Sequence, residues 1–354
     1  MPSPKKHLEK IDRVNLDSVS RRGFLRLDKN ENPGGLPKEF INEVLSKIDT
    51  EFISSYPEYG KVKEKIANHI GLKPVNISLS NGSDNAIKNI FETYVSKDDN
   101  ILVTDPTFAM YPIYSKIFNA HIISVPYHSI DFFPKEEFLD ALDEDVKISV
   151  IVNPNNPTGS SVDIPFIEQA LRKAQQYDSI VIVDEAYHYY YPETAMNLIH
   201  DYDNLIVLRT FSKMFSMASL RLGYAAANEQ IVNHLQKIKP TFEVNSVATL
   251  FGAKILERKE IIDELILEES EGKRFLSEKL REENIECKIG KANFILIKCG
   301  KRVNEIMEKL EERKILIGGG FNQDFLKDYI RVTTGKMEIM NRFFDEFIKI
   351  WRNE

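Results

Sequence analysis

Cysteine is scarce in this sequence: its 354 residues contain Cys287 and Cys299 and no other cysteine. Two cysteines at this spacing form neither a metal-ligand motif nor a disulfide framework, so we interpret both as ordinary thiols in a reducing compartment. The segment from Met1 to Asp12 is polar and lacks the apolar stretch of a secretory signal peptide. Apolar runs long enough to span a membrane are also missing. These absences predict a cytoplasmic protein without a membrane segment.

Basic residues are in the minority, because 47 Lys and Arg stand against 54 Asp and Glu, for a formal net charge of −7. Without a basic surplus, neither nucleic acid nor an anionic membrane is an expected partner. Hydrophobic residues make up 42% and charged residues 29% of the chain, an ordinary balance for a globular protein. At roughly 100–200 residues per domain, the length predicts about two domains.

The middle of the chain alternates short β-branched runs with amphipathic stretches. Helical patterns such as Asp84–Tyr94 and Ile164–Tyr177 separate runs that are often continuously apolar, as expected of strands covered on both faces. This order predicts an α/β domain built on an open, mostly parallel sheet. The predicted strands are Ile77–Ser80, Ile101–Thr104, Ile122–Val125, Ile148–Asn153, Ile180–Asp184, Leu205–Arg209 and Tyr224–Ala227.

After about Glu229 the order of strands and helices becomes mixed, which predicts a smaller α+β domain. The first part of the chain is too short and irregular for a domain of its own. We therefore predict an N-terminal arm (1–40) that packs on the small domain, a large domain (41–235) and a small C-terminal domain (236–354). The predicted elements of this last part are helices at Lys259–Glu283, Val303–Arg313 and Met337–Trp351, and strands at Asn293–Lys298, near Ile315 and at Tyr329–Thr333.

The most informative segment is 205–223, in which an apolar strand ends at a Thr-Phe-Ser-Lys turn. Alone, Lys213 would more often be a surface residue, because most lysines lie on solvated faces. Its neighbours change that interpretation: Thr210 and Ser212 offer hydroxyl groups and Arg221 offers a guanidinium fork, a combination that suits a phosphate. A lysine beside a phosphate site is what an enzyme needs to hold an aldehyde cofactor as a Schiff base.

A second candidate is Asp184, which ends a predicted strand at the carboxyl edge of the sheet, where open α/β sheets bind ligands. An isolated Asp at such a place is more often a turn or N-cap residue. Tyr187 follows closely and is able to point toward the same ligand. An aspartate against a pyridine nitrogen keeps that nitrogen protonated, and a protonated ring accepts electrons far better.

Two loop segments add polar groups. Asn156 lies in a loop rich in Pro and Gly after a strand, and its side chain can hydrogen-bond a ring oxygen or a substrate oxygen. At a second junction Gly82 permits a tight turn, and the free amides at the helix start near Ser83 and Asp84 can hold an anion. Each signal is weak by itself, since the first suits an ordinary loop and the second a well-capped helix.

Together these motifs resemble the class I and II aminotransferases, which are fold type I enzymes that depend on pyridoxal phosphate. Within that family the sequence looks most like the histidinol-phosphate aminotransferase branch. The resemblance runs from Leu27–Pro33 to Tyr329–Gly335 and so covers nearly the whole chain. It implies a large domain with a mostly parallel central sheet, a smaller α+β domain, and pyridoxal 5′-phosphate as the cofactor.

The resemblance also implies a role for each candidate residue. Lys213 would bind the cofactor aldehyde and later move the proton, and Asp184 would pair with the pyridinium nitrogen. Tyr187 and Asn156 would hydrogen-bond the phenolic oxygen of the ring. The phosphate would be held by Arg221, Ser212, Ser83 and Asp84 (the last two mainly through backbone amides), together with Thr210.

Further roles follow from the same resemblance. Phe108 lies where the family places an aromatic ring stacked on the pyridine, often a tyrosine, so stacking is kept while a hydrogen bond is lost. Tyr56 matches a tyrosine that reaches the cofactor phosphate of the neighbouring subunit, which implies a homodimer with shared active sites. Arg331 matches the arginine that binds the carboxylate or phosphate of the substrate. Asn32 and Arg22 are additional candidates for substrate binding.

One stretch departs from the pattern of the branch. Its members usually carry a second arginine shortly before the one matched by Arg331, whereas here Gly318–Gly320 occupies that stretch. The glycine run lacks the strand–turn–helix context of a nucleotide site, and we interpret it as a flexible turn. Loss of the arginine would weaken binding of a phosphorylated substrate. Candidates for a replacement charge are Arg21, Arg22, Arg313 and Lys314, although a solvated face is the better interpretation of each.

Three hypotheses for the function follow. The first is an aminotransferase that links glutamate and 2-oxoglutarate to a small, phosphorylated amino alcohol or keto compound, with histidinol phosphate as the leading candidate. The second is a decarboxylase of a phosphorylated amino acid, as in the threonine-phosphate decarboxylase relatives, which would share the cofactor residues. The third is a non-catalytic binding protein, which has no need of Lys213, Asp184, Tyr187 and Arg221 together.

Overall fold

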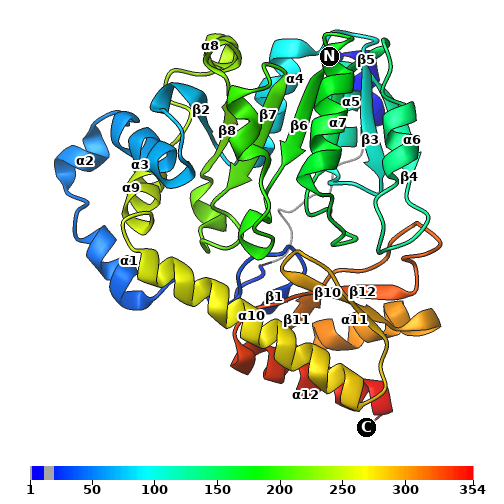
Figure 1. Cartoon of the computed structure of the whole chain (residues 1–354). Helices are drawn as coiled ribbons and strands as arrows, with labels where there is room; N and C mark the ends of the chain where they lie inside the picture. Colours follow the sequence, from blue (N-terminus) through cyan, green and yellow to red (C-terminus); the bar gives the residue numbers. More distant parts are fainter. Residues whose placement is uncertain (1, 12–19, 354) are drawn as a thin grey trace.

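The computed structural model describes residues 2–11 and 20–353. Its largest element is a seven-stranded sheet with the strand order β2-β8-β7-β6-β5-β3-β4. These strands run across the upper half of the molecule in Figure 1. Their bounds are β2 Ile77–Ser80, β3 Asn100–Asp105, β4 His121–Pro126, β5 Val146–Val152, β6 Ile180–Asp184, β7 Leu205–Thr210 and β8 Gly223–Ala227.

The five neighbouring strands β4, β3, β5, β6 and β7 pair with one another in parallel. Strand β8 runs antiparallel to both of its neighbours, β7 and β2. Helical crossovers separate the parallel strands along the chain, as parallel pairing requires. The predicted α/β class with a mostly parallel central sheet is therefore confirmed. Where the predicted strands and helices differ from those in the structure, they differ by one or two residues at an end.

Both faces of the large sheet are covered, which explains the continuously apolar strands. On β6, Val181 and Val183 belong to the same core as helices α6 and α7, whereas Ile180 and Ile182 pack with α4, α5 and α8 on the opposite face. Side chains alternate between the two faces of a strand, so one apolar run serves both layers. The covering helices are α4 Ser83–Tyr94, α5 Met110–Phe118, α6 Lys135–Asp140, α7 Ile164–Gln175 and α8 Glu229–Ile238.

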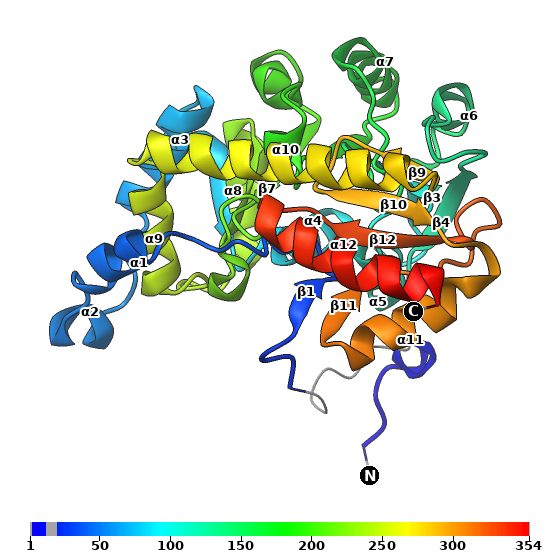
Figure 2. The same cartoon turned by 90° about the horizontal axis from the view of Figure 1, so that it is seen from below.

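The second unit has its own core, below the large sheet in Figure 1. Its antiparallel sheet has the order β12-β10-β9, and a separate parallel pair joins β1 to β11. Helices α10 and α12 run side by side along this unit (Figure 2). The bounds are β1 Leu25–Leu27, β9 Cys287–Ile289, β10 Phe294–Lys298, β11 Ile315–Ile317, β12 Tyr329–Thr333, α10 Lys259–Glu282, α11 Val303–Glu312 and α12 Met337–Arg352.

The remaining helices form the left side of Figure 1. They are α1 Lys38–Leu45, α2 Thr50–Ser54, α3 Gly60–Ile70 and α9 Ser246–Ile255. The core of the large sheet takes in Ala248 and Phe251 of α9 and reaches Leu265 in α10. The packing of the large unit therefore continues beyond the predicted boundary at 235, because α9 lies against α3 and α1.

The N-terminal segment contacts both units. Its strand β1 pairs with β11 of the smaller unit. The short 3-10 helix η1 (Lys6–Lys10) instead lies against α5, and the His7 ring is 3.0 Å from the carbonyl oxygen of Ile117. The arm was predicted to pack on the small domain, and this part of it packs on the large one. Residues 12–19 of the predicted arm lie outside the described residues.

The longest helix of the described residues, α10, has 24 residues and carries charged side chains along its length. None of the helices in residues 2–11 and 20–353 combines the length and the apolarity needed to cross a membrane.

A buried ion pair joins the carboxyl end of β6 to β7. Arg209 donates two hydrogen bonds to Oε2 of Glu185, at 3.0 and 2.8 Å, and the two side chains are 6% and 1% exposed. The Glu185 carboxylate also accepts hydrogen bonds from the hydroxyl of Thr194 and the backbone amide of Ala195. Because every oxygen of this carboxylate has a donor, the pair is tolerated in the core.

We expect Arg209→Met to lower the free energy of unfolding by about 3–5 kcal/mol, because Glu185 would stay buried without its cation. The control is Lys88→Met, which removes the exposed pair between Lys88 and Glu92 at 2.9 Å and should cost less than about 1 kcal/mol. Urea unfolding measures both. Equal losses in the two variants would contradict a special role for the buried pair.

Candidate active site

The predicted site residues meet at the carboxyl edge of the large sheet. Phe108 follows β3, Asn156 follows β5, Asp184 ends β6 and Lys213 follows β7. These four strands are adjacent and parallel, so their carboxyl ends lie along one edge. Open α/β sheets bind ligands at this edge. The smaller unit contributes Arg331 from β12.

Lys213 lies between charges of both signs. Its Nζ atom donates a hydrogen bond of 2.8 Å to the backbone carbonyl of Lys29. The pKa of Lys213 is lowered to about 8, mainly by burial and also by the positive charges of Arg331 and Arg221, while Glu31 and Asp184 act in the opposite direction. A lysine with such a pKa has a substantial neutral fraction near neutral pH, as a nucleophile or general base needs.

Asp184 is 2% exposed and has a donor for each carboxylate oxygen. The hydroxyl of Tyr111 donates to Oδ2 at 2.9 Å, and the backbone amide of Ala186 donates to Oδ1 at 3.1 Å. Burial raises the pKa of Asp184 to about 6, against the effect of these two hydrogen bonds. At neutral pH the group is therefore mostly a buried carboxylate, which favours a cationic ligand.

Tyr111 was not among the predicted site residues. It is fully buried, and its ring meets that of Phe108 edge-on with centroids 6.3 Å apart. The two residues belong to one short segment after β3, at the start of α5. The sequence therefore contained a signal for Tyr111, because this residue follows the predicted site residue Phe108 by about one helical turn.

An anion cradle forms where the start of α4 meets Arg221. Ser83 and Asp84 occupy the first turn of α4, whose amides have no partner within the helix. A Cβ atom on Gly82 would lie 2.3 Å from Nη2 of Arg221, and one on Gly223 would lie 2.4 Å from the amide nitrogen of Ser83. Glycine at both positions lets the guanidinium and the helix amides approach one space, as phosphate binding requires.

Two hydroxyl groups adjoin this cradle. Ser212 accepts a hydrogen bond of 3.2 Å from Nη1 of Arg221, so its hydroxyl lies at the cradle. Thr210 accepts a hydrogen bond of 3.0 Å from the amide of Ser212 instead. The structure therefore gives the Thr210 hydroxyl a local role in the turn before Lys213. The Asp84 side chain accepts from Tyr114 at 3.0 Å, which leaves its backbone amide as the group available to an anion.

Arg331 reaches Asn156 across the two units. Nη1 of Arg331 donates to Oδ1 of Asn156, and Nη2 donates to the backbone carbonyl of Asp28 at 2.7 Å. The guanidinium also lies over the ring of Phe294, 5.4 Å from its centroid. Nε of Arg331 is buried without a hydrogen-bond partner among the described residues. An orphaned donor of this kind fits an acidic group of a ligand.

Tyr187 is 4% exposed, and its hydroxyl accepts a hydrogen bond of 2.7 Å from the side-chain amide of Asn30. Its ring lies below Lys213, with Nζ 6.0 Å from the centroid. Asn30 was not predicted as a site residue. Because it is distant in sequence from Tyr187, no local pattern pointed to it.

Several predicted substrate residues have other partners. The Asn32 amide donates to the carbonyl of Met214 at 3.3 Å, while its oxygen accepts from the amide of Gly34 at 3.0 Å, so its side chain fixes a turn. Arg22 is exposed. The other candidate cations are bound elsewhere: Arg21 pairs with Asp28, Arg313 pairs with Glu346 at 2.8 Å, and Lys314 lies 4.7 Å from the ring centroid of Phe24.

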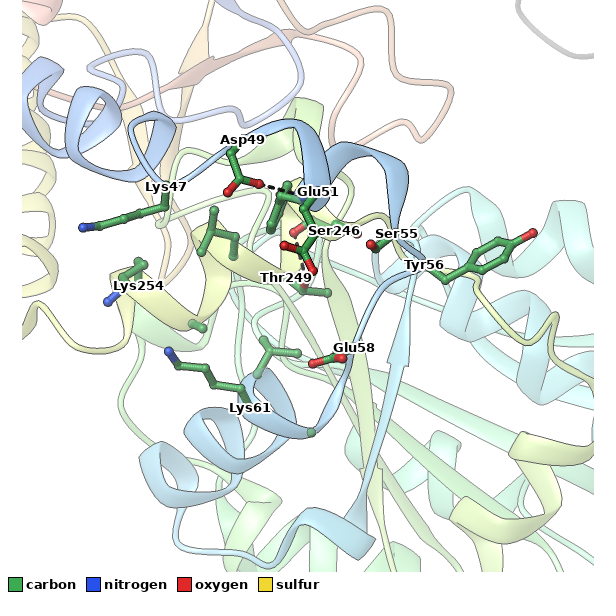
Figure 3. Close-up of a pocket in the computed structure, with 15 residues that line it drawn as sticks. Lys47, Asp49, Glu51, Ser55, Tyr56, Glu58, Lys61, Ser246, Thr249 and Lys254 are labelled. Atoms are coloured by element: carbon green, nitrogen blue, oxygen red, sulfur yellow. Dashed lines mark hydrogen bonds between the residues drawn. The ribbon is translucent and has the colours of Figure 1, made fainter.

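Tyr56 lies apart from these residues in the single chain. It is 76% exposed and stacks on Phe242, with ring centroids 4.2 Å apart. Figure 3 shows it at one end of an open groove of about 490 Å³, extending away from the other labelled side chains. The groove lies among α2, α3 and α9 and contains none of the other predicted cofactor residues.

The fold and the site geometry match a known class of enzyme. The family model described as aminotransferase class I and II matches residues 22–347. The chain therefore belongs to this family, whose members are pyridoxal-phosphate-dependent transaminases of fold type I.

Within the family, the chain is similar to histidinol-phosphate aminotransferases. It is 35% identical over 319 residues to the enzyme of Thermoanaerobacter sp. (strain X514), covering 88% of this chain and 89% of that one. It is 30% identical over 346 residues to that of Geobacillus sp. (strain WCH70), covering 95% and 91%.

Solved structures agree on the fold. Histidinol-phosphate aminotransferase from Sinorhizobium meliloti, in complex with pyridoxal-5′-phosphate, has a TM-score of 0.87 at 20% identity, with 99% of each chain covered. Aspartate aminotransferase from Thermus thermophilus with maleate has a TM-score of 0.80 at 16% identity, with 99% of this chain and 100% of that chain covered.

The residues present fit the cofactor of this family. The glycines at 82 and 223 leave room for a phosphate at Arg221 and the start of α4. Asp184 is a buried carboxylate able to face a pyridinium nitrogen, and Lys213 is an amine of lowered pKa beside it.

We predict that the rate at which cofactor-free protein captures pyridoxal phosphate rises with pH to a plateau, with a midpoint near the Lys213 pKa of about 8. Only the neutral amine attacks the aldehyde, and its fraction grows as the pH rises through the pKa. Stopped-flow absorbance at several pH values measures this rate. Arg331→Gln should move the midpoint to higher pH, because the Arg331 charge lowers the pKa of Lys213. A midpoint near the ordinary value of 10.5 would contradict the effect of burial.

Proposed function

We propose that this aminotransferase moves an amino group between glutamate or 2-oxoglutarate and a small phosphorylated compound, with histidinol phosphate as the leading candidate. The observation that carries the proposal is the position of Lys213. Its amine has a lowered pKa and lies within the electrostatic reach of both Asp184 and Arg331. The identity of 30–35% to histidinol-phosphate aminotransferases supports the choice of substrate.

Pyridoxal phosphate supplies an aldehyde for the substrate amine and a ring that takes up electrons from the substrate carbon. The chain holds and orients the reactants. Lys213 takes the proton from the substrate carbon as a general base and delivers it to the cofactor carbon as a general acid. Asp184 keeps the ring nitrogen protonated, since a buried carboxylate favours a cation beside it. Tyr187 and Asn156 direct hydrogen bonds to the ring oxygen.

Arg331 is the proposed binding group for the acidic end of the substrate. This role is supported by its contact with Asn156 and by its Nε atom, which is buried and has no hydrogen-bond partner among the described residues. Gly318 pairs with the Arg331 backbone through hydrogen bonds of 2.9 and 2.8 Å, and a Cβ there would lie 3.3 Å from Nε. Backbone at Gly318 therefore occupies the stretch where the branch usually carries a second arginine. We propose that the guanidinium of Arg331 alone recognises the anion.

Tyr56 supports a further proposal, that the active sites are shared in a homodimer. The side chain is exposed and lines a groove that does not include Arg221, whereas the resemblance assigns it to a cofactor phosphate. A second copy that presents its Tyr56 to the anion cradle would reconcile the exposed side chain with the role that the resemblance implies. Leu45 in α1, Ile53 in α2 and Phe242, which stacks on Tyr56, are exposed apolar side chains that such a dimer would cover.

The substrate class is tested with the pyridoxamine form of the enzyme and a panel of keto compounds, phosphorylated and not. We expect the keto analogue of histidinol phosphate and 2-oxoglutarate to restore the visible absorption of the lysine-bound cofactor. Release of carbon dioxide from phosphorylated amino acids, without recovery of a keto product, would support the decarboxylase alternative. Restoration by unphosphorylated keto compounds alone would exclude histidinol phosphate as substrate.

Arg331→Ala should raise KM for the phosphorylated substrate by about 10- to 100-fold, because a charge-assisted hydrogen bond is lost. Arg331→Lys keeps the charge and loses the fork, so we expect an intermediate KM. Steady-state kinetics measure both variants. Unchanged KM values would show that another group binds the anion.

Hybrid dimers test the shared site. We expect Lys213→Ala and Tyr56→Ala homodimers to be inactive or weakly active, and the co-expressed, doubly tagged hybrid to regain activity in one of its two sites. If Tyr56 acted in its own chain, each site of the hybrid would carry one defect and no activity would return.

A further inference from the structure

Three consecutive residues of the N-terminal segment each contact a different group of the site. The carbonyl of Asp28 accepts a hydrogen bond from Arg331, and the carbonyl of Lys29 accepts one from Lys213, at 2.7 and 2.8 Å. The side chain of Asn30 donates to the hydroxyl of Tyr187 at 2.7 Å. The contacts of Asp28 and Lys29 use backbone carbonyls, so of the three contacts only that of Asn30 depends on the identity of the side chain.

We propose that Asn30 is a positioning residue that directs the hydroxyl proton of Tyr187 toward the ring oxygen of the cofactor. The inference rests on the proposed role of Tyr187. A phenolic oxygen is both a donor and an acceptor. When the Asn30 amide occupies an acceptor site on this oxygen, the Tyr187 proton points elsewhere, and the ring oxygen is the acceptor proposed for it.

The surroundings of Asn30 fix its side chain. The residue is 1% exposed, and its backbone has a φ of +56°, a left-handed conformation that Asn tolerates better than most residues. Its amide N–H donates to the hydroxyl of Thr333 at 3.1 Å, and its carbonyl accepts from the side chain of Asn293 at 3.2 Å. Burial raises the pKa of Tyr187 and the Asn30 hydrogen bond lowers it, which agrees with an acceptor role for the Tyr187 oxygen.

The same contacts tie Asn30 to the strand that carries Arg331. Thr333 lies two positions after Arg331 on β12, and its hydroxyl donates to the carbonyl of Leu27 at 2.8 Å. A shift of β12 therefore moves Asn30 with it. This link holds the smaller unit and Tyr187 of the larger unit in one geometry. The smaller unit carries Arg331, the proposed binding group for the substrate, and Tyr187 is the proposed donor to the cofactor ring.

We expect Asn30 to affect the titration of the proton that the Lys213 nitrogen and the ring oxygen of the bound cofactor share. A hydrogen bond from Tyr187 to the ring oxygen stabilises the state in which that oxygen is negative and the proton has left. Weakening the bond therefore raises the pH midpoint at which the visible absorption of the holoenzyme changes. The cofactor affinity should fall in parallel, because one hydrogen bond to the ring is impaired.

The variants are chosen to keep the backbone of position 30. Asn30→Gly accepts the positive φ and removes the amide donor. Asn30→Asp keeps the shape and replaces the donor with an acceptor, which would turn the Tyr187 proton away from the ring. We expect the midpoint to rise by about half to one pH unit in Asn30→Gly and by more in Asn30→Asp. Spectrophotometric pH titration of the holoenzyme measures the midpoint.

The double variant separates positioning from a structural role. In the Tyr187→Phe background, Asn30→Gly should cause no further shift, because its effect passes through the missing hydroxyl. Additive shifts, or no shift in either Asn30 variant while Tyr187→Phe shifts the midpoint, would overturn the inference. No shift in Tyr187→Phe itself would instead overturn the proposed role of Tyr187.

Thr333 offers a second approach should the Asn30 variants fold poorly. Thr333→Val removes the hydroxyl that holds the Asn30 backbone, whereas Thr333→Ser retains it. We expect a raised midpoint in the first variant and the wild-type midpoint in the second. Equal midpoints in both would contradict the link between β12 and Tyr187.

Discussion

The pairing of β6 with β7 is the constraint on which the site depends. In this parallel register Asp184 is opposite Leu208, so the carboxylate that ends one strand lies beside the segment that leads to Lys213 on the next. Parallel pairing sends the carboxyl ends of neighbouring strands to one edge. The buried pair of Glu185 and Arg209 joins these two strands directly behind the site. Asp184 and the segment that leads to Lys213 are thus held together by the pairing of β6 with β7.

Burial sets the chemistry of these groups. Asp184 and Lys213 both lose water, and the loss raises the pKa of the acid and lowers that of the amine. Each shift brings the group closer to neutral pH, where proton transfer is efficient. The chain has a net charge of −7, yet Arg221 and Arg331 make this region a place for anions. Local packing, and not the average charge, therefore decides which ligands bind.

The local motifs of the site could be predicted from the sequence, and its long-range contacts could not. Asp184 and Lys213 each end or follow an apolar strand, and such a pattern is visible in a few residues. Asn30 contacts Tyr187 and Thr333, which are far from it in the chain, and these contacts exist only after both units have folded. The contact of Tyr111 with Asp184 is also long-range, because Tyr111 follows β3 and Asp184 ends β6, with β5 between these strands in the sheet.

Two of the predicted site residues have close partners that the sequence did not indicate. Thr210, predicted to bind the phosphate, accepts a hydrogen bond from the amide of Ser212, and its own hydroxyl proton stays available to an anion. Arg21, a candidate for a replacement charge at the substrate, forms an ion pair with Asp28. Both cases show a polar side chain with a close neighbour as its partner, a contact that sequence patterns do not reveal.

We propose Lys213 as the residue that binds the cofactor. Borohydride reduction of the holoenzyme followed by peptide mass mapping tests it most directly, because reduction makes the lysine–cofactor bond permanent. We expect a single peptide, the one containing Lys213, to carry the added pyridoxyl-phosphate mass. Attachment to any other lysine, or no attachment in a protein saturated with pyridoxal phosphate, would contradict it.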